Sequence, residues 1–173
     1  NLFSWKYSEY QKIFNQDKIE NQKINFEKSS LIVYSGSPHY LTRKGSRIIY
    51  SFFNQSNGLD FVNEINQNTF KFIQALKKGN LDIMKKCLNQ EEELRRNFLK
   101  YRIPAASSRI ISIARDNDCG VKFLGGGGGG CLWILGREDK VSKVKEKIYH
   151  LKTASILSFS IDYQGVTSRV LST

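Results

Sequence analysis

The chain has 173 residues, of which 40% are hydrophobic, so it has the length of about one domain and the apolar content of an ordinary globular protein. It contains no apolar run near the roughly 18 residues of a membrane span, so a membrane is not an expected partner. The three cysteines form no C-x-x-C pair and only two histidines are present. We therefore expect no disulfide framework, no structural zinc site or metal-ligating residues, and a cytoplasmic location.

The formal net charge of +11 is open to two interpretations. The Lys and Arg residues are spread along the chain, mostly beside Asp and Glu on predicted helix faces. They form either a solvated basic surface or part of a site for a polyanionic nucleotide. Because no basic arm and no aromatic-interleaved recognition motif is present, nucleic acid is not an expected partner.

The first predicted elements are a short strand over residues 2–7 and a polar connection or short helix over residues 9–28. The compact apolar run at residues 30–35 predicts a buried strand, and Gly-Ser-Pro at 36–38 predicts a turn after it. A helix is predicted over residues 42–54, with Ile and Phe side chains on its apolar face.

Three further helices are predicted in the middle of the chain. One follows Gly58 and ends at Gly79, and a long amphipathic helix covers residues 81–98. Ser107 or Ser108 is predicted to cap the third helix, which ends before the next strand.

The last third of the chain contains two short apolar runs, residues 121–124 and 131–135, which predict strands. A surface helix is predicted over residues 138–149, and the alternation over residues 155–163 predicts a half-buried strand. The order of these elements predicts an α+β fold, in which helices cover one face of an antiparallel sheet.

Six consecutive glycines, Gly125 to Gly130, join the two apolar runs. Glycine runs are often flexible linkers, but linkers usually have polar flanks, so the apolar flanks here favour an ordered loop. Because glycine is costly to order, such a loop indicates positive φ at several positions or close approach of another group to bare main chain. Its N–H groups could bind an anion such as phosphate. No P-loop or Rossmann fingerprint is present, because neither Gly-Lys-Ser/Thr nor a helix follows.

The run from Lys122 to Cys131 resembles the third conserved motif of the GHMP kinases, which include galactokinase, homoserine kinase, mevalonate kinase and phosphomevalonate kinase. In that motif, Lys and two variable residues precede Gly-Ala-Gly-Gly-Gly-Gly-Cys. Residues 31–39, Leu-Ile-Val-Tyr-Ser-Gly-Ser-Pro-His, resemble the strand and turn that open the C-terminal domain of the sugar- and heptose-kinase-like members. Residues 157–165 are similar to their closing strand.

The resemblance implies a GHMP kinase C-terminal domain over residues 30–173, with a ferredoxin-like α+β fold, and a connecting segment over residues 1–29 left from an N-terminal domain. The chain departs from the motif at Gly126, where Ala is usual, and at Leu124, where a hydroxyl or thiol side chain is common. The family's phosphate loop and general base belong to the N-terminal domain, and their motifs do not occur in this sequence. We therefore expect the chain to be inactive alone.

The resemblance further implies the C-terminal half of an ATP-dependent small-molecule kinase that phosphorylates a sugar or another alcohol. ATP and Mg²⁺ are the implied cofactors, and an N-terminal kinase half, in cis or in trans, is the implied partner. No catalytic residue is assigned. The implied nucleotide-binding residues are Gly125, Gly126, Gly127, Gly128 and Gly129, and the implied substrate-binding residues are His39 and Tyr40.

Several alternatives stay open at this point. His39 could instead be a turn residue that caps main chain, and Lys122 could be an ordinary strand lysine rather than a ligand contact. A rival function is a non-catalytic kinase-like module that uses a basic surface to bind RNA or an acidic partner. A C-terminal half separated from its neighbouring domain should also expose apolar surface, around Phe3, Trp5 and the helix at residues 42–54. We therefore expect the chain either to self-associate as a homo-oligomer or to need its N-terminal half for solubility.

Overall fold

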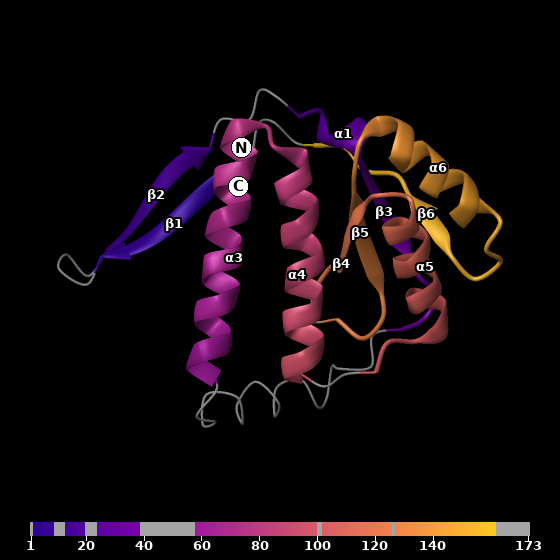
Figure 1. The fold of residues 1–173 in the computed structure, drawn as a ribbon, viewed down its shortest axis with the longest axis horizontal. Coiled ribbons are helices and arrows are strands. Elements are labelled where there is room, and N and C mark those ends of the chain that lie inside the picture. Colours follow the sequence, from indigo (N-terminus) through magenta and orange to yellow (C-terminus); the bar gives the residue numbers. More distant parts are fainter. Residues whose placement is uncertain are drawn as a thin grey trace, which may run out of the picture.

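The computed structural model describes the backbone of residues 2–8 and 13–19, and residues 24–38, 58–99, 102–125 and 127–161 with their side chains. The main sheet has four strands in the order β4-β5-β3-β6, and every neighbouring pair is antiparallel (Figure 1). Its strands are β3 (Ser30–Tyr34), β4 (Gly120–Phe123), β5 (Cys131–Leu135) and β6 (Ser155–Leu157). A separate antiparallel pair consists of β1 (Leu2–Ser8) and β2 (Ile13–Ile19).

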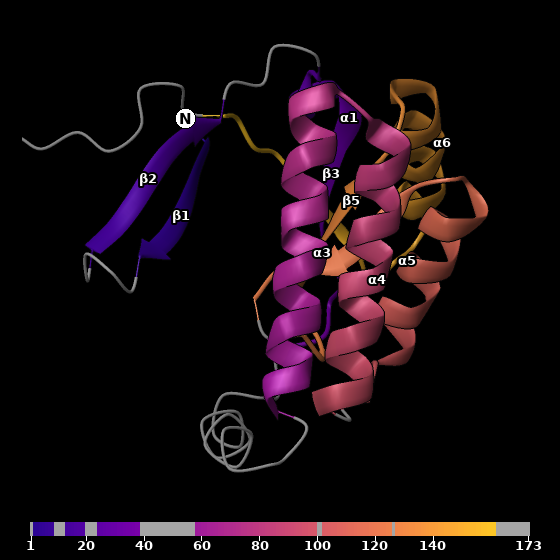
Figure 2. The same ribbon diagram turned by 60° about the vertical axis from the view of Figure 1, so that its left-hand side comes forward.

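The described helices are packed against the main sheet. They are α1 (Phe26–Ser29), α3 (Gly58–Lys78), α4 (Leu81–Leu99), α5 (Ala105–Asp116) and α6 (Glu138–Tyr149). Figure 1 shows α4 on one side of the strands and α5 and α6 on the other, and Figure 2 shows α3 and α4 side by side. The α+β fold with an antiparallel sheet covered by helices is confirmed, but helices lie on both faces of the sheet rather than on one, because alternate residues of β5 pack on α5 and α6 and on α3 and α4.

The larger core lies between the sheet and the helices α5 and α6. Alternate residues of β5, Leu132 and Ile134, are fully buried and point to this side. The side chains of α6 that enter this core are the three that helical spacing predicts: Val141, Val144 and Ile148. Burial of such apolar side chains is the main favourable contribution to folding.

A second apolar cluster joins α3 and α4 to the opposite face of β5. Trp133 packs against Phe72 and Phe26, with ring centroids 6.1 and 6.4 Å apart. Its indole N–H also donates a 3.0 Å hydrogen bond to Ser30 Oγ. The indole ring is therefore held at both ends, by aromatic packing and by a polar contact in the neighbouring strand.

The helix boundaries agree closely with the predicted ones, with one exception. Gly79 has φ +67° after α3, and Asn80 Oδ1 accepts a 3.1 Å hydrogen bond from Ile83 N at the start of α4, as the Gly-Asn sequence indicates. The serine cap predicted for α5 is wrong, because Pro104 is the N-cap. Ser107 lies inside the helix, and its buried hydroxyl has no hydrogen-bond partner among the described residues.

Two predictions about the strands also need correction. The segment predicted as a connection over residues 9–28 contains β2 as well as the short helix α1. The predicted strand at 155–163 is paired only over β6, where Ile156 packs against the core while Leu157 and Phe159 are exposed. The predicted helix at 42–54 and its apolar face lie outside the described residues, and the division of the chain at residues 29 and 30 stays a prediction.

Candidate functional site

Five of the six glycines between β4 and β5 are described, namely Gly125 and Gly127 to Gly130. Leu124 N donates a 2.8 Å hydrogen bond to Cys131 O, which closes the loop at its base. The φ angle is +79° at Gly125, +88° at Gly127, +76° at Gly128, +141° at Gly129 and +81° at Gly130. Residues that carry a Cβ atom rarely adopt such positive φ angles. The prediction of an ordered loop with repeated positive φ is therefore confirmed for these five glycines.

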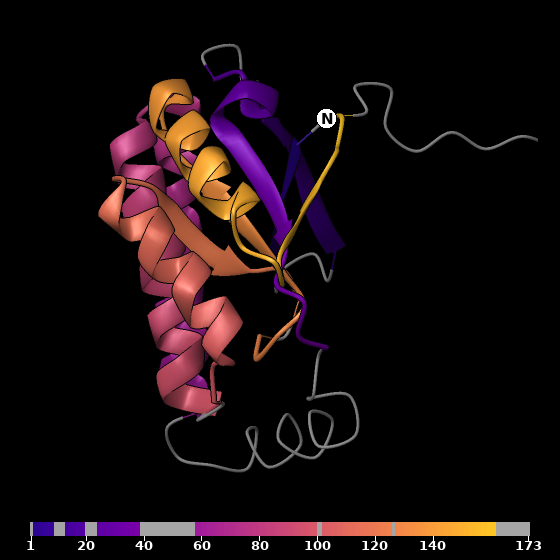
Figure 3. The same ribbon diagram turned by 90° about the vertical axis from the view of Figure 1, so that its right-hand side faces the viewer.

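The turn after β3 packs directly on this loop. Ser35 N donates a 3.0 Å hydrogen bond to Gly130 O, and Gly130 N donates one of 2.8 Å to Ser37 O. A Cβ at Gly129 would stand 2.5 Å from the carbonyl oxygen of Pro38. Figure 3 shows the loop and the turn at the same end of the sheet. Close approach of main chain to bare glycine therefore occurs here together with positive φ.

The predicted substrate residues follow this turn in sequence. Pro38 is described and touches the loop, whereas His39 and Tyr40 lie outside the described residues. Their assignment to a substrate pocket stays a prediction. In the sequence, they directly follow Pro38, the last described residue of the turn.

A charged cluster borders the first residue of the loop. The Glu91 carboxylate contacts Lys122 Nζ at 2.6 Å and Arg95 Nη2 at 2.9 Å. Arg95 Nη1 also donates a 3.0 Å hydrogen bond to Gly125 O. One carboxylate therefore faces two cations, and the carboxyl group of Glu92, which accepts a 3.3 Å hydrogen bond from Phe123 N, is a second acidic group beside them.

Sequence reasoning named Lys122 and missed Glu91 and Arg95. The spacing of these two residues, i and i+4, indicates only a common helical pair on α4. Nothing in the sequence shows that this helix lies beside the glycine loop, because that contact depends on tertiary packing. The structure also shows that Lys122 is held by Glu91 in the chain as it stands.

The two ends of the loop differ from its middle in accessibility. Gly127, Gly128 and Gly129 are buried, whereas an added Cβ at Gly125 or Gly130 would meet no heavy atom within 4 Å. The side chain of Leu124, where the family motif commonly has a hydroxyl, is 41% exposed at the same edge. An anionic group could therefore approach the loop at its ends, the first of which lies beside Arg95 and Lys122.

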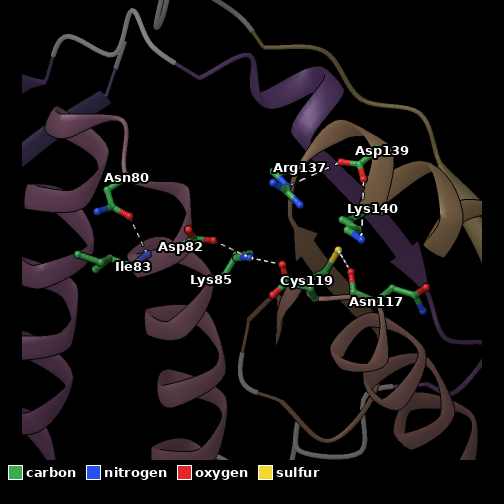
Figure 4. A network of polar contacts seen from close by, with 10 residues as sticks. Asn80, Asp82, Ile83, Lys85, Asn117, Cys119, Arg137, Asp139 and Lys140 are labelled. Atoms are coloured by element: carbon green, nitrogen blue, oxygen red, sulfur yellow. Dashed lines mark hydrogen bonds and ion pairs between the residues drawn. The ribbon is translucent and has the colours of Figure 1, made fainter.

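A second polar cluster joins α4 to the turn before β4. The buried Lys85 ammonium lies 2.8 Å from both Asp82 Oδ1 and Asp118 Oδ2, and Figure 4 shows its position beside Asp82. Burial by itself would lower the pKa of Lys85, but the hydrogen bonds to Asp118 and Asp82 outweigh it, and the pKa is raised. The hydrogen bond from Lys85 lowers the pKa of Asp82. The charge on Lys85 is therefore matched within the fold.

This second cluster lines a surface cavity of about 440 Å³, to which Lys86, Glu93 and Arg115 also contribute. Acidic and basic side chains occur there in equal number. The Arg115 guanidinium contacts Glu93 at 3.3 Å. The cavity therefore shows no charge preference that would identify a ligand.

In the described ranges, no three His, Cys, Asp or Glu side chains come together as metal ligands. Among the same residues, no helix combines the length and the apolar character that a membrane span requires.

Part of the chain matches a known protein family. Residues 72–151, from α3 through α6, match the family model "GHMP kinases C terminal". A search of curated protein sequences returns no match to the chain.

Solved structures show the same fold. Streptococcus pneumoniae phosphomevalonate kinase superposes with a TM-score of 0.69 at 14% identity, over 84% of this chain and 42% of its own. Its complex with phosphomevalonate and AMPPNP gives a TM-score of 0.65 at 13% identity, over 84% and 42% of the two chains. Methanococcus jannaschii mevalonate kinase gives 0.61 at 25% identity, over 83% and 43%.

The chain thus spans less than half the length of these kinases. The resemblance stated from the glycine motif, the matched family model and the shared fold all agree on the same region. Residues 72–151 of this chain therefore match the C-terminal domain of the GHMP kinase family, and the described part of the chain has the fold of these solved kinases.

Proposed function

We propose that this chain is the C-terminal part of an ATP-dependent kinase that phosphorylates the hydroxyl group of a small molecule. The observation that carries the proposal is the ordered glycine loop, which is held against the turn after β3 and bordered at its first residue by Arg95 and Lys122. A solved kinase of the same fold was crystallised with phosphomevalonate and AMPPNP, which supports a nucleotide and a small acceptor as ligands.

In this proposal, ATP supplies the phosphoryl group that is transferred to the acceptor hydroxyl. The chain's own contribution is positioning and charge stabilisation, which dominate catalysis of phosphoryl transfer. The ends of the glycine loop, at Gly125 and Gly130, leave room for an anionic group, and Lys122 and Arg95 lie beside the first of them. Mg²⁺ would be held mainly through the phosphates of the nucleotide, as is usual in kinase sites.

The acceptor is proposed as an alcohol. The solved relatives are named for mevalonate and phosphomevalonate, and they lend no support to a sugar, which the resemblance to sugar- and heptose-kinase-like members implies. His39 and Tyr40 stay the proposed substrate-binding residues, because the turn that precedes them touches the loop.

The phosphate loop and the general base are proposed to come from an N-terminal kinase half, in cis or in trans, so the chain alone should not turn over ATP. A cytoplasmic location is part of the same proposal. The rival function, a basic module that binds RNA or an acidic partner, has no specific support. Many described cations pair with carboxylates, among them Lys28 with Glu138 and Arg115 with Glu93.

The test is to express the chain together with an N-terminal GHMP kinase half and to measure ADP release with a panel of alcohols that includes mevalonate, phosphomevalonate and sugars. We expect turnover only when both halves are present. Gly127→Val should abolish this turnover while the variant still folds, because a β-branched side chain at φ +88° distorts the loop. The proposal is refuted if no alcohol supports ADP release, or if the chain alone is equally active.

A further inference from the structure

The first observation concerns the outer edge of the sheet. β4 is an edge strand of the four-stranded sheet, and α4 runs along it. Asn89 Oδ1 accepts a 2.9 Å hydrogen bond from Val121 N, and Glu92 Oε2 accepts one of 3.3 Å from Phe123 N. Side chains of α4 therefore occupy the hydrogen-bonding positions that another strand would otherwise use.

Arg95 continues this row of contacts into the glycine loop. On α4, residues 89, 92 and 95 are three apart, so they share one face of the helix. Their partners are Val121 and Phe123, two apart in β4, and Gly125, which follows two residues later in the loop. The third member of the row is the 3.0 Å hydrogen bond from Arg95 Nη1 to Gly125 O. The last contact of this row is therefore made to the first glycine of the loop.

The guanidinium of Arg95 is itself held in one orientation. Its Nη2 contacts Glu91 one turn earlier on α4, and the same carboxylate contacts Lys122 in β4. Its Nε is buried and has no hydrogen-bond partner within the described part of the chain. Because a buried donor without a partner is costly, the two Nη contacts must be what fixes the side chain in this place.

We propose that Arg95 is a positioning residue for the glycine loop: its guanidinium, oriented by Glu91, fixes the first peptide of the loop in the positive-φ conformation. The inference rests on the proposed function for its purpose, since the loop is the proposed nucleotide-binding element. It adds a residue on α4 that acts through Gly125 rather than by touching the substrate.

The test is amide hydrogen exchange, followed by NMR, on the full 173-residue chain without nucleotide. The reporters are the amides of Leu124 and Gly130, whose hydrogen bonds close the loop. Arg95→Ala should raise their exchange rates at least about tenfold, which corresponds to about 1.4 kcal/mol, near the low end for a hydrogen bond to a charged group. The amide of Val144 in α6 should keep its rate.

Matched variants separate positioning from charge and from folding. Arg96→Ala removes the neighbouring arginine, which has no ion pair within the described residues, and should leave all three reporters unchanged. Arg95→Lys keeps the charge but lacks the planar fork, so the loop should still open. Glu91→Gln removes the charge that orients Arg95 and should raise the same two rates by a smaller factor.

The inference is overturned if Arg95→Ala leaves Leu124 and Gly130 protected, if Val144 exchanges faster to the same extent, or if Arg95→Lys restores full protection. None of these outcomes depends on kinase activity. If the loop opens in Arg95→Ala while the assembled wild-type halves release no ADP with any alcohol, the positioning role is upheld and the proposed function is refuted.

Discussion

The contact between the glycine loop and the turn after β3 can be tested by placing the same methyl group at two neighbouring glycines. At Gly129, a Cβ would stand 2.5 Å from the Pro38 carbonyl oxygen, whereas at Gly130 it would meet no heavy atom within 4 Å. Both residues have positive φ. Gly130→Ala should therefore cost only backbone strain, about 1–2 kcal/mol.

Gly129→Ala carries backbone strain as well, and it also forces the loop away from the turn. Overpacking of this kind costs typically about 1–3 kcal/mol. We expect the free energy of unfolding to fall by that much more in Gly129→Ala than in Gly130→Ala. In a chain of this length, each kcal/mol of difference should lower the melting temperature by about 2–4 °C.

The assay is urea-induced unfolding followed by far-UV circular dichroism, with the slope of the transition compared between variants to confirm that both unfold from similar states. Equal destabilisation by the two substitutions would refute the reasoning. It would mean that the turn does not restrain the loop, and that strain at positive φ explains the effect of both changes.

Three further predictions concern the packing of α4 on β4. Gly120→Ala should lower the free energy of unfolding by about 1–3 kcal/mol, because the methyl would stand 2.6 Å from backbone atoms of Lys85; urea unfolding of wild-type stability would contradict this. Burial raises the pKa of Cys119 to about 11, so its thiol should not react with a disulfide reagent at neutral pH until the chain is unfolded. Reaction in the folded chain would show that the site opens. Because the pKa of Asp82 is held below its ordinary 3.8, its stabilisation is complete above that value and is lost as the pH falls through the lower folded value. Asp82→Asn should therefore be slightly less stable than wild type at neutral pH, and equally stable well below pH 3.8.

Local signals in the sequence predicted the elements that depend on local physics. The helix α6 and its three inward side chains follow from spacing, and the end of α3 follows from Gly79 and Asn80. The glycine loop is ordered because its apolar flanks form paired strands, as the flanks indicate. The predicted start of α5 is wrong because serine is a common N-cap and Ser107 and Ser108 both suit that position. The helix instead starts after Pro104, whose fixed φ suits a helix start.

The features that the sequence does not predict depend on tertiary contacts. Arg95 and Glu91 look like any i,i+4 pair on a basic helix, and their place beside Gly125 follows only from the path of α4 along the edge of β4. The exposure of Leu157 could not be predicted either, because alternation shows which residues share a face of a strand but not which face packs on the core.

The pairing of Ser35 with Gly130 has a consequence for the order of events in folding. These two residues lie far apart in the chain, and their hydrogen bond can form only after β3 has paired with β5. Closing so long a segment costs entropy that must be recovered by the contacts made afterwards. The glycine loop should therefore acquire its shape late, after the sheet is assembled. A chain whose β3 pairing is weakened would lose this loop geometry before it lost its helices.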